Sequence, residues 1–203
     1  MLRVAVCISG NGSLVPSLLE EERKGKFKIS CVVADRPHAP GLKNRWAQKV
    51  ETLCIDRRVY SDALSDAVLE ALQPRADLIV LAGFLSILEG TILEEYEGRI
   101  INIHPALLPK FGGKGMYGMN VHRAVVSAGE KESGCTVHHV TAGIDSGPII
   151  LQRKVALTSH ETPESVQKKV RQIESPTLIA AVNKLSDSLE AVSYNPVKVQ
   201  GGC

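Results

Sequence analysis

The stretch DLIVLAGFLSILEGTILEEYEGRIINIH, residues 77–104, joins two apolar runs through a short helical pattern. Residues 77–83 and 98–103 each predict a strand, and residues 91–98 predict the helix between them. Strands that are apolar on both faces are typical of a parallel sheet that helices cover on two sides. The stretch therefore predicts one strand–helix–strand unit of an α/β fold.

The same alternation of strands and helices extends toward the amino terminus. Strands are predicted at 2–9, 27–34 and 51–56, and helices at 14–25, 42–50 and 60–73. Because each helix returns the chain before the next strand, we expect these strands to run parallel to one another.

The pattern changes after residue 134. Residues 134–142 alternate apolar and polar side chains, and residues 147–157 follow after a tight turn, which predicts an antiparallel hairpin. We therefore expect a three-layer α/β fold with an open sheet. The sheet is mostly parallel and Rossmann-like, with an antiparallel hairpin near the C-terminal part, in one domain over residues 1–203.

The last part of the chain predicts one helix and a tail. Residues 162–186 have helical spacing, and Pro176 inside them predicts a kink or a break. Residues 194–203 are expected to form a tail.

Composition narrows the class of protein. The chain has 203 residues, 44% of them hydrophobic, and a net charge of +2, which disfavours a general nucleic-acid or membrane binder. No apolar run reaches the roughly 18 residues of a membrane helix, and the first strand is too short for a secretory segment. Five scattered cysteines do not form a disulfide framework. We expect a cytoplasmic protein.

A glycine turn follows the first predicted strand in the segment ISGNGSL, residues 8–14. Free amides at a helix start attract a phosphate, and glycine lets a ligand approach the backbone closely. The turn equally fits a tight strand-to-helix connection with Ser13 as the helix cap. Its spacing lacks the third glycine of a dinucleotide site and the Gly-Lys-Ser of a triphosphate loop, which leaves a single phosphate as the favoured ligand.

Asn102 and His104 lie two positions apart at the carboxyl end of a predicted strand, so their side chains share one face. Ligands bind at this end of parallel sheets. The amide of Asn102 can donate to a carbonyl oxygen, and His104 can carry a proton. Asp145 in the later turn could raise the pKa of His104. The three groups suit an oxyanion formed when an external amine attacks an acyl carbon.

Other interpretations of these residues remain open. His104 could be a packed strand-end histidine, and Asp145 an ordinary turn residue. Cys135 has histidines near it in the chain, but nothing marks it as an activated thiol. A zinc site is possible in principle from four residues, His104, His122, His138 and Asp145. Their spacing in the chain does not match a zinc-binding pattern.

The combination of motifs resembles the phosphoribosylglycinamide formyltransferase family. ISGNGS, LAGFLSIL, GRIINIHPALLPKFGGKG and GIDSGPIILQ occur in that family's order and spacing, over roughly residues 2 to 180. The resemblance implies the formyltransferase fold. It also implies transfer of a formyl group from the co-substrate 10-formyltetrahydrofolate to the amine of glycinamide ribonucleotide, in purine biosynthesis and without a metal.

The resemblance also implies roles for the catalytic residues. Asn102 would polarise the formyl oxygen, and His104 would donate a proton and stabilise the oxyanion. Asp145 would keep His104 protonated. The attacking amine belongs to the substrate, which agrees with the lack of a serine or cysteine nucleophile in the motif.

The substrate-binding residues implied by the resemblance lie at two places in the chain. Gly12, Ser13 and Leu14 match the turn that cradles the substrate phosphate, although Leu14 stands where the family usually has Asn. Glu174 matches an acidic residue that contacts the ribose, and the Ser175 beside it departs from the usual His. Lys114, in a glycine-rich loop, is a further candidate for the phosphate.

The folate-binding residues implied by the resemblance come from three segments. Leu85, Ser86, Ile87 and Leu88 match the lining of the pterin pocket, with Ser86 at a position that is often Arg. Arg57, or its neighbour Arg58, matches an arginine near the folate's acidic tail, and Asn102 also contacts the folate.

Three other functions stay open at this point. The chain could act on another formyl acceptor, such as an aminoacyl-tRNA or an amino sugar; it could hydrolyse formyl-folate; or it could be a folate-binding module without activity. The expected partners are small molecules, with no nucleic acid and no membrane. The expected state is a monomer or a homodimer.

Overall fold

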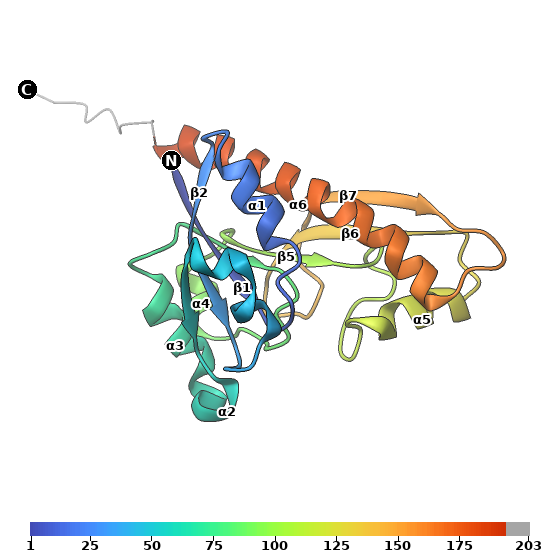
Figure 1. Cartoon of the computed structure of the whole chain (residues 1–203), viewed down its shortest axis with the longest axis horizontal. Helices are drawn as coiled ribbons and strands as arrows, with labels where there is room; N and C mark the ends of the chain where they lie inside the picture. The colour runs from blue at the N-terminus through green and yellow to red at the C-terminus, as the bar shows by residue number, and fades with distance from the viewer. Residues whose placement is uncertain (194–203) are drawn as a thin grey trace, which may run out of the picture.

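A computed structural model of the chain describes residues 1–193, and side chains up to residue 189. Within this range seven strands form one sheet in the order β3-β2-β1-β4-β5-β6-β7 (Figure 1). The strands are β1 (Leu2–Ile8), β2 (Phe27–Ala34), β3 (Glu51–Cys54), β4 (Leu78–Leu81), β5 (Ile100–His104), β6 (Glu132–His139) and β7 (Ile149–Ala156). The predicted tail at 194–203 lies outside the described residues.

The first five strands in the chain pair in parallel, and the last two pair antiparallel. β1 lies between β2 and β4, β3 pairs with β2, and β5 pairs with β4, all in parallel. β6 runs antiparallel to both β5 and β7. The predicted open sheet, mostly parallel with an antiparallel hairpin, is confirmed. β5 therefore lies where the parallel and antiparallel parts of the sheet meet, with β4 on one side and β6 on the other.

Helices cover both faces of the sheet (Figure 1). The α-helices are α1 (Val15–Glu22), α2 (Arg57–Tyr60), α3 (Leu64–Leu72), α4 (Thr91–Glu95), α5 (Met119–Ser127) and α6 (Pro163–Ser193). One apolar core cluster joins the sheet to α1, α5 and α6, and a second joins the opposite face to α3 and α4. All four residues of β4 are buried, as expected for a strand covered on two sides.

Two helical predictions are corrected by the structure. The predicted helix at 42–50 is two short 3₁₀ turns, η1 (Pro40–Lys43) and η2 (Arg45–Gln48), and a third, η3 (Ser61–Ala63), precedes α3. Helix α6 runs through Pro176, so the predicted break is absent, while the alternative of a kink at Pro176 stays a prediction. Pro176 is exposed, whereas Thr177, Leu178 and Ala181 beyond it are fully buried. Packing of that face offsets the roughly 3 kcal/mol cost of a proline inside a helix.

The sequence patterns above do not predict α5. This helix buries Val121, His122 and Val125, a spacing of one helical turn, but the mean hydropathy around it is low and glycines precede it. Its position matters for function, because it follows directly on the loop that closes over the end of β5.

No helix within residues 1–193 has the length and apolar character required to cross a membrane.

Candidate active site

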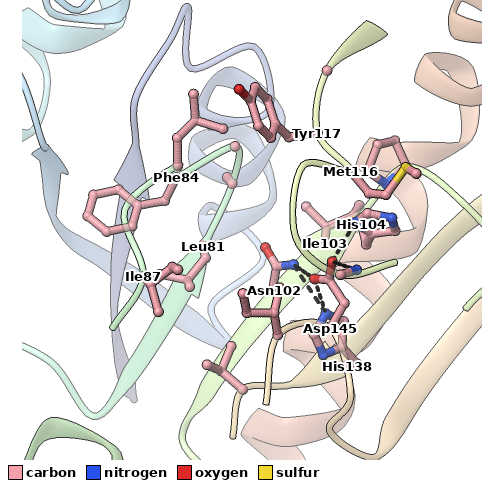
Figure 2. A pocket seen from close by; sticks show the side chains of 18 of the residues that line it. Leu81, Phe84, Ile87, Asn102, Ile103, His104, Met116, Tyr117, His138 and Asp145 are labelled. Atoms are coloured by element: carbon pink, nitrogen blue, oxygen red, sulfur yellow. Dashed lines mark hydrogen bonds and ion pairs between the residues drawn. The ribbon is translucent and has the colours of Figure 1, made fainter. Parts of the chain in front are cut away.

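A cavity of about 500 Å³ opens at the carboxyl ends of β4 and β5 (Figure 2). Its wall is formed by those strand ends, by the loops at 82–88, 113–118 and 140–145, and by the polar residues Gln167, Arg171 and Glu174 of α6. A cavity of this size is typical of sites for small molecules. The structure therefore places a ligand site at the edge where parallel sheets bind ligands.

Asn102 and His104 both point into this cavity from β5, as their spacing predicts. The Nδ2 group of Asn102 donates to Oδ1 of Asp145 at 3.4 Å and lies 3.1 Å from Nε2 of His138 (Figure 2). His138 donates from Nδ1 to the carbonyl oxygen of His139 at 2.9 Å, so its Nε2 is free to accept from Asn102. The Asn102 amide is therefore held with its N–H groups toward the centre of the cluster.

His104 is 3% exposed and contacts an acceptor through each ring nitrogen. Nε2 donates to the carbonyl oxygen of Phe111 at 2.8 Å, and Nδ1 lies 3.5 Å from Oδ2 of Asp145. Burial lowers the pKa of His104 below its ordinary value, although Asp145 and the Phe111 carbonyl act in the opposite direction. The direction of this shift favours a neutral ring in the free site, with its proton on Nε2, whereas the expectation that Asp145 keeps His104 protonated stays a prediction.

Asp145 completes the cluster from the turn between β6 and β7. Its Oδ2 accepts the backbone N–H of Gly113 at 3.0 Å, and its backbone has a φ of 52°, a conformation that asparagine and aspartate tolerate. Burial by itself would raise the pKa of Asp145, but His138, His104 and the Gly113 N–H together lower it. Asp145 is therefore an anion at neutral pH, beside a ring that can gain a proton.

Gly112 allows the loop before α5 to approach Asp145. A Cβ at this position would lie 2.6 Å from Cδ2 of Leu108 and 3.1 Å from Cβ of Asp145. We expect Gly112→Ala to push the carboxylate away from His104 and to lower kcat by about tenfold, because small displacements of a catalytic group slow the reaction. Steady-state kinetics with thermal unfolding as the folding check would measure this. An unchanged kcat in a folded variant would contradict the close approach.

The glycine turn reaches the cavity through Ser13. Gly12 has a φ of 61°, and a Cβ there would lie 2.8 Å from Trp46, so glycine is required for this turn to pack. Ser13 is exposed at the cavity wall and makes no cap bond to α1, which excludes the interpretation of Ser13 as a helix cap. The side chain of Leu14 is buried in the core and, like Gly12, does not line the cavity, so its contact with the substrate stays a prediction.

Glu174 also lines the cavity, as predicted, and Arg171 lies one helical turn before it. Burial raises the pKa of Glu174, while the positive charge of Arg171 opposes this shift. Arg171 and Gln167 were not predicted from the sequence, because a polar helix surface gives no sign of which side faces a ligand. Together these groups make one end of the cavity polar.

The predicted folate segment forms an apolar part of the wall. Leu85, Ser86, Ile87 and Leu88 all line the cavity, and Leu85 and Ile87 are 43% and 60% exposed. Large apolar side chains exposed at a cavity suit a flat ring system. Leu88 is instead mostly buried and belongs to the core cluster that joins the sheet to α3 and α4.

Arg57 lies outside the cavity wall, beside a buried carboxylate. Its Nη1 is 3.5 Å from Oδ2 of Asp35, which also accepts the hydroxyl of Ser86 at 2.7 Å. Asp35 is fully buried, and its other oxygen has no partner among residues 1–193. The neighbouring Arg58 pairs with Asp56. Arg57 therefore connects to the predicted folate segment through Asp35.

The thiol and the zinc site considered from the sequence correspond to different parts of the structure. Burial raises the pKa of the Cys135 thiol to about 11, and its sulfur contacts the carbonyl of Ile173, so it is a core residue. Within residues 1–193 no group of three or more His, Cys, Asp or Glu side chains has an arrangement that could hold a metal ion.

A profile of the formyl transferase family matches residues 2–182. The chain belongs to the formyl transferase family. It is 35% identical over 179 residues to the phosphoribosylglycinamide formyltransferase of Haemophilus influenzae, covering 86% of this chain and 82% of that protein. It is also 36% identical to the trifunctional purine biosynthetic protein adenosine-3 of Gallus gallus, covering 89% of this chain. The chain spans 18% of the length of that trifunctional relative.

Solved structures of this family have the same fold. Glycinamide ribonucleotide transformylase 1 from Symbiobacterium toebii superposes with a TM-score of 0.85 at 35% identity, covering 93% of this chain and 89% of that one. Phosphoribosylglycinamide formyltransferase from Bacillus halodurans gives 0.84 at 29% identity, covering 95% of this chain and 100% of that one. The formyltransferase fold inferred from the motifs is confirmed.

Proposed function

We propose that the chain transfers the formyl group of 10-formyltetrahydrofolate to the amine of glycinamide ribonucleotide. The observation that carries the proposal is the convergence of Asn102, His104 and Asp145 in one cavity at the end of β5. These groups can stabilise charge and move a proton, and none is a nucleophile of the serine or cysteine type. Family relatives named for this reaction support the same assignment.

Asn102 and His104 have different roles in the proposed reaction. In the free site the two Nδ2 hydrogens of Asn102 face His138 and Asp145. When the folate binds, one hydrogen turns from the long 3.4 Å contact with Oδ1 of Asp145 to the formyl oxygen, where negative charge develops as the substrate amine adds to the formyl carbon. His104 accepts the amine proton at Nδ1, because Nε2 already carries the proton donated to Phe111. His104 then returns the proton to the leaving nitrogen of the folate. One C–N bond forms, one breaks, and the enzyme is unchanged.

Asp145 stabilises the imidazolium that exists between these two proton transfers. Its Oδ2 lies 3.5 Å from Nδ1 of His104, and the Gly113 N–H holds the carboxylate in place. A carboxylate at this distance favours the charged ring. His104 can therefore gain the proton transiently although the free site favours the neutral form.

The two ends of the cavity suit the two substrates. Leu85 and Ile87 offer exposed apolar surface to the pterin ring, and Arg57, outside the cavity wall and connected to Ser86 through Asp35, is the proposed contact of the acidic tail. Ser13, on the cavity wall beside the tight turn at Gly12, is the proposed contact of the phosphate, and Glu174 is the proposed contact of the ribose hydroxyls.

The reaction can be tested by following loss of 10-formyltetrahydrofolate with and without glycinamide ribonucleotide. Turnover that requires the ribonucleotide, with the formylated product identified by mass spectrometry, supports the proposal. Turnover without an amine would indicate a formyl-folate hydrolase, and turnover only with an aminoacyl-tRNA or amino sugar would indicate another acceptor. Folate binding without turnover would indicate a binding module.

Lys114 gives a further prediction for the phosphate end. It is exposed at the cavity wall in the loop before α5. We expect Lys114→Ala to raise KM for glycinamide ribonucleotide by about tenfold, as for loss of a bond to a charged group, and to leave KM for the folate unchanged. Lys28→Ala, which removes an exposed lysine outside the cavity, is the control. Equal KM values in both variants would contradict a phosphate contact.

Other expectations from the sequence stay predictions. These are a single domain over residues 1–203, a cytoplasmic location, and a monomer or homodimer that binds neither nucleic acid nor membrane.

A further inference from the structure

His122 is a buried polar residue that the reaction proposed above does not use. It projects from α5 onto the cavity wall and is 2% exposed. Its Nδ1 is sealed inside the protein without a partner, and Nε2 makes no hydrogen bond within the described part of the chain. Buried polar groups are almost always paired, so an unpaired imidazole on a cavity wall indicates a partner supplied by a ligand.

The tautomer of His122 follows from the position of its nitrogens. A sealed N–H without an acceptor is rarer in proteins than a sealed acceptor without a donor. The proton is therefore expected on Nε2, the nitrogen left open at the cavity. Burial, helped by the positive charge of Arg171, lowers the pKa of His122 to about 4, so the ring stays neutral near pH 7. A neutral Nε2–H needs an acceptor oxygen.

The position of His122 selects which part of the substrate it meets. Its ring lines the same cavity as Arg171 and His104, and the positive charges of both residues act on its pKa, so His122 lies near the polar residues of α6 and near the catalytic cluster. The substrate amine must reach His104, whereas the ribose and phosphate occupy the end near Glu174 and Ser13. The carboxamide that joins the amine to the ribose has to pass between these two places.

We propose that His122 donates from Nε2 to the carboxamide oxygen of the glycinamide group and so sets the distance between the reacting amine and the ribose. This inference rests on the proposed function. It assigns a specificity role to His122: an acceptor that lacks this carbonyl would leave the imidazole unpaired, which costs affinity beyond the lost contact.

The test compares His122→Leu with His122→Gln. Leu keeps an apolar wall, and Gln keeps an N–H donor near the place of Nε2. We expect His122→Leu to raise KM for glycinamide ribonucleotide by about tenfold, with KM for 10-formyltetrahydrofolate unchanged, and His122→Gln to restore most of the loss. Circular dichroism tests whether both variants fold. If His122→Leu does not fold, His122→Gln is compared with His122→Asn, whose shorter side chain cannot place a donor at the position of Nε2.

Ribose 5-phosphate separates the carboxamide from the rest of the substrate. It shares the sugar and phosphate but has no carboxamide, so its inhibition constant should be equal in wild type and His122→Leu. An inhibition constant that rises in His122→Leu as much as KM does would overturn the proposal. An unchanged KM for glycinamide ribonucleotide in His122→Leu would also overturn it, because that result is expected if only water pairs with Nε2. Failure of the wild type to formylate the ribonucleotide would instead reject the proposed function.

Discussion

Replacing Asn102 by Asp is expected to lower kcat by about 10²–10³-fold, the usual cost of losing an oxyanion donor. The two side chains have the same shape, so the strand and the cavity keep their form. The change removes the Nδ2 donor and places a second carboxylate oxygen near Oδ1 of Asp145, 3.4 Å away in the native site. The variant then lacks the stabilising N–H and repels the charge that develops on the formyl oxygen.

Steady-state kinetics at saturating concentrations of both substrates measure this effect. Gln73→Glu is the matched control, because it exchanges an amide for an acid on an exposed residue away from the cavity. The control should retain the wild-type kcat, which excludes a general effect of added negative charge. A kcat for Asn102→Asp within a few-fold of wild type would remove Asn102 from the proposed chemistry.

The sequence predicted the fold and the positions of the site residues where both depend on a single strand. The runs that became β4 and β5 are apolar on both faces, so they predicted a covered parallel sheet without any knowledge of their neighbours. Asn102 and His104 are two positions apart on β5, and the period of a strand alone placed both side chains in one cavity.

His138 shows where that reasoning stops. It pairs with Asn102 only because the antiparallel register places the two residues opposite each other on β5 and β6. The strands are separated by a loop and by α5, so no turn fixes their register in the sequence. The alternation of β6 showed that His138 and His139 face opposite sides, but not which of the two faces the ligand.

The charge on His104 could not be predicted for a similar reason. Asp145 raises the pKa of His104, as expected, but burial acts more strongly in the other direction. That burial depends on how the loop at 110–115 folds over the ring and offers the Phe111 carbonyl to Nε2. Local sequence identifies the two charged partners, whereas the desolvation of each depends on the complete fold.

Replacing Asp145 by Asn is expected to lower kcat/KM by about 10²–10⁴-fold, the range found for general acid–base groups. Asparagine tolerates the positive φ at this position, so the turn should persist. What is lost is the anion 3.5 Å from Nδ1 of His104. Without it, the imidazolium that forms when His104 accepts the amine proton has no opposite charge beside it, and proton transfer becomes harder.

The pH dependence of the same variant tests which group titrates. In the proposed mechanism the neutral ring is active, so kcat/KM should fall as the pH drops through the pKa of His104, below its ordinary value of 6.5. Asp145 raises that pKa, and therefore Asp145→Asn should move the acid limb to lower pH. Ionisation of the substrate amine is common to both enzymes and cancels in their ratio. Asp66→Asn, an exposed carboxylate on α3, should leave the limb in place. A limb that stayed fixed in Asp145→Asn, or moved to higher pH, would mean that His104 is not the group whose proton Asp145 controls.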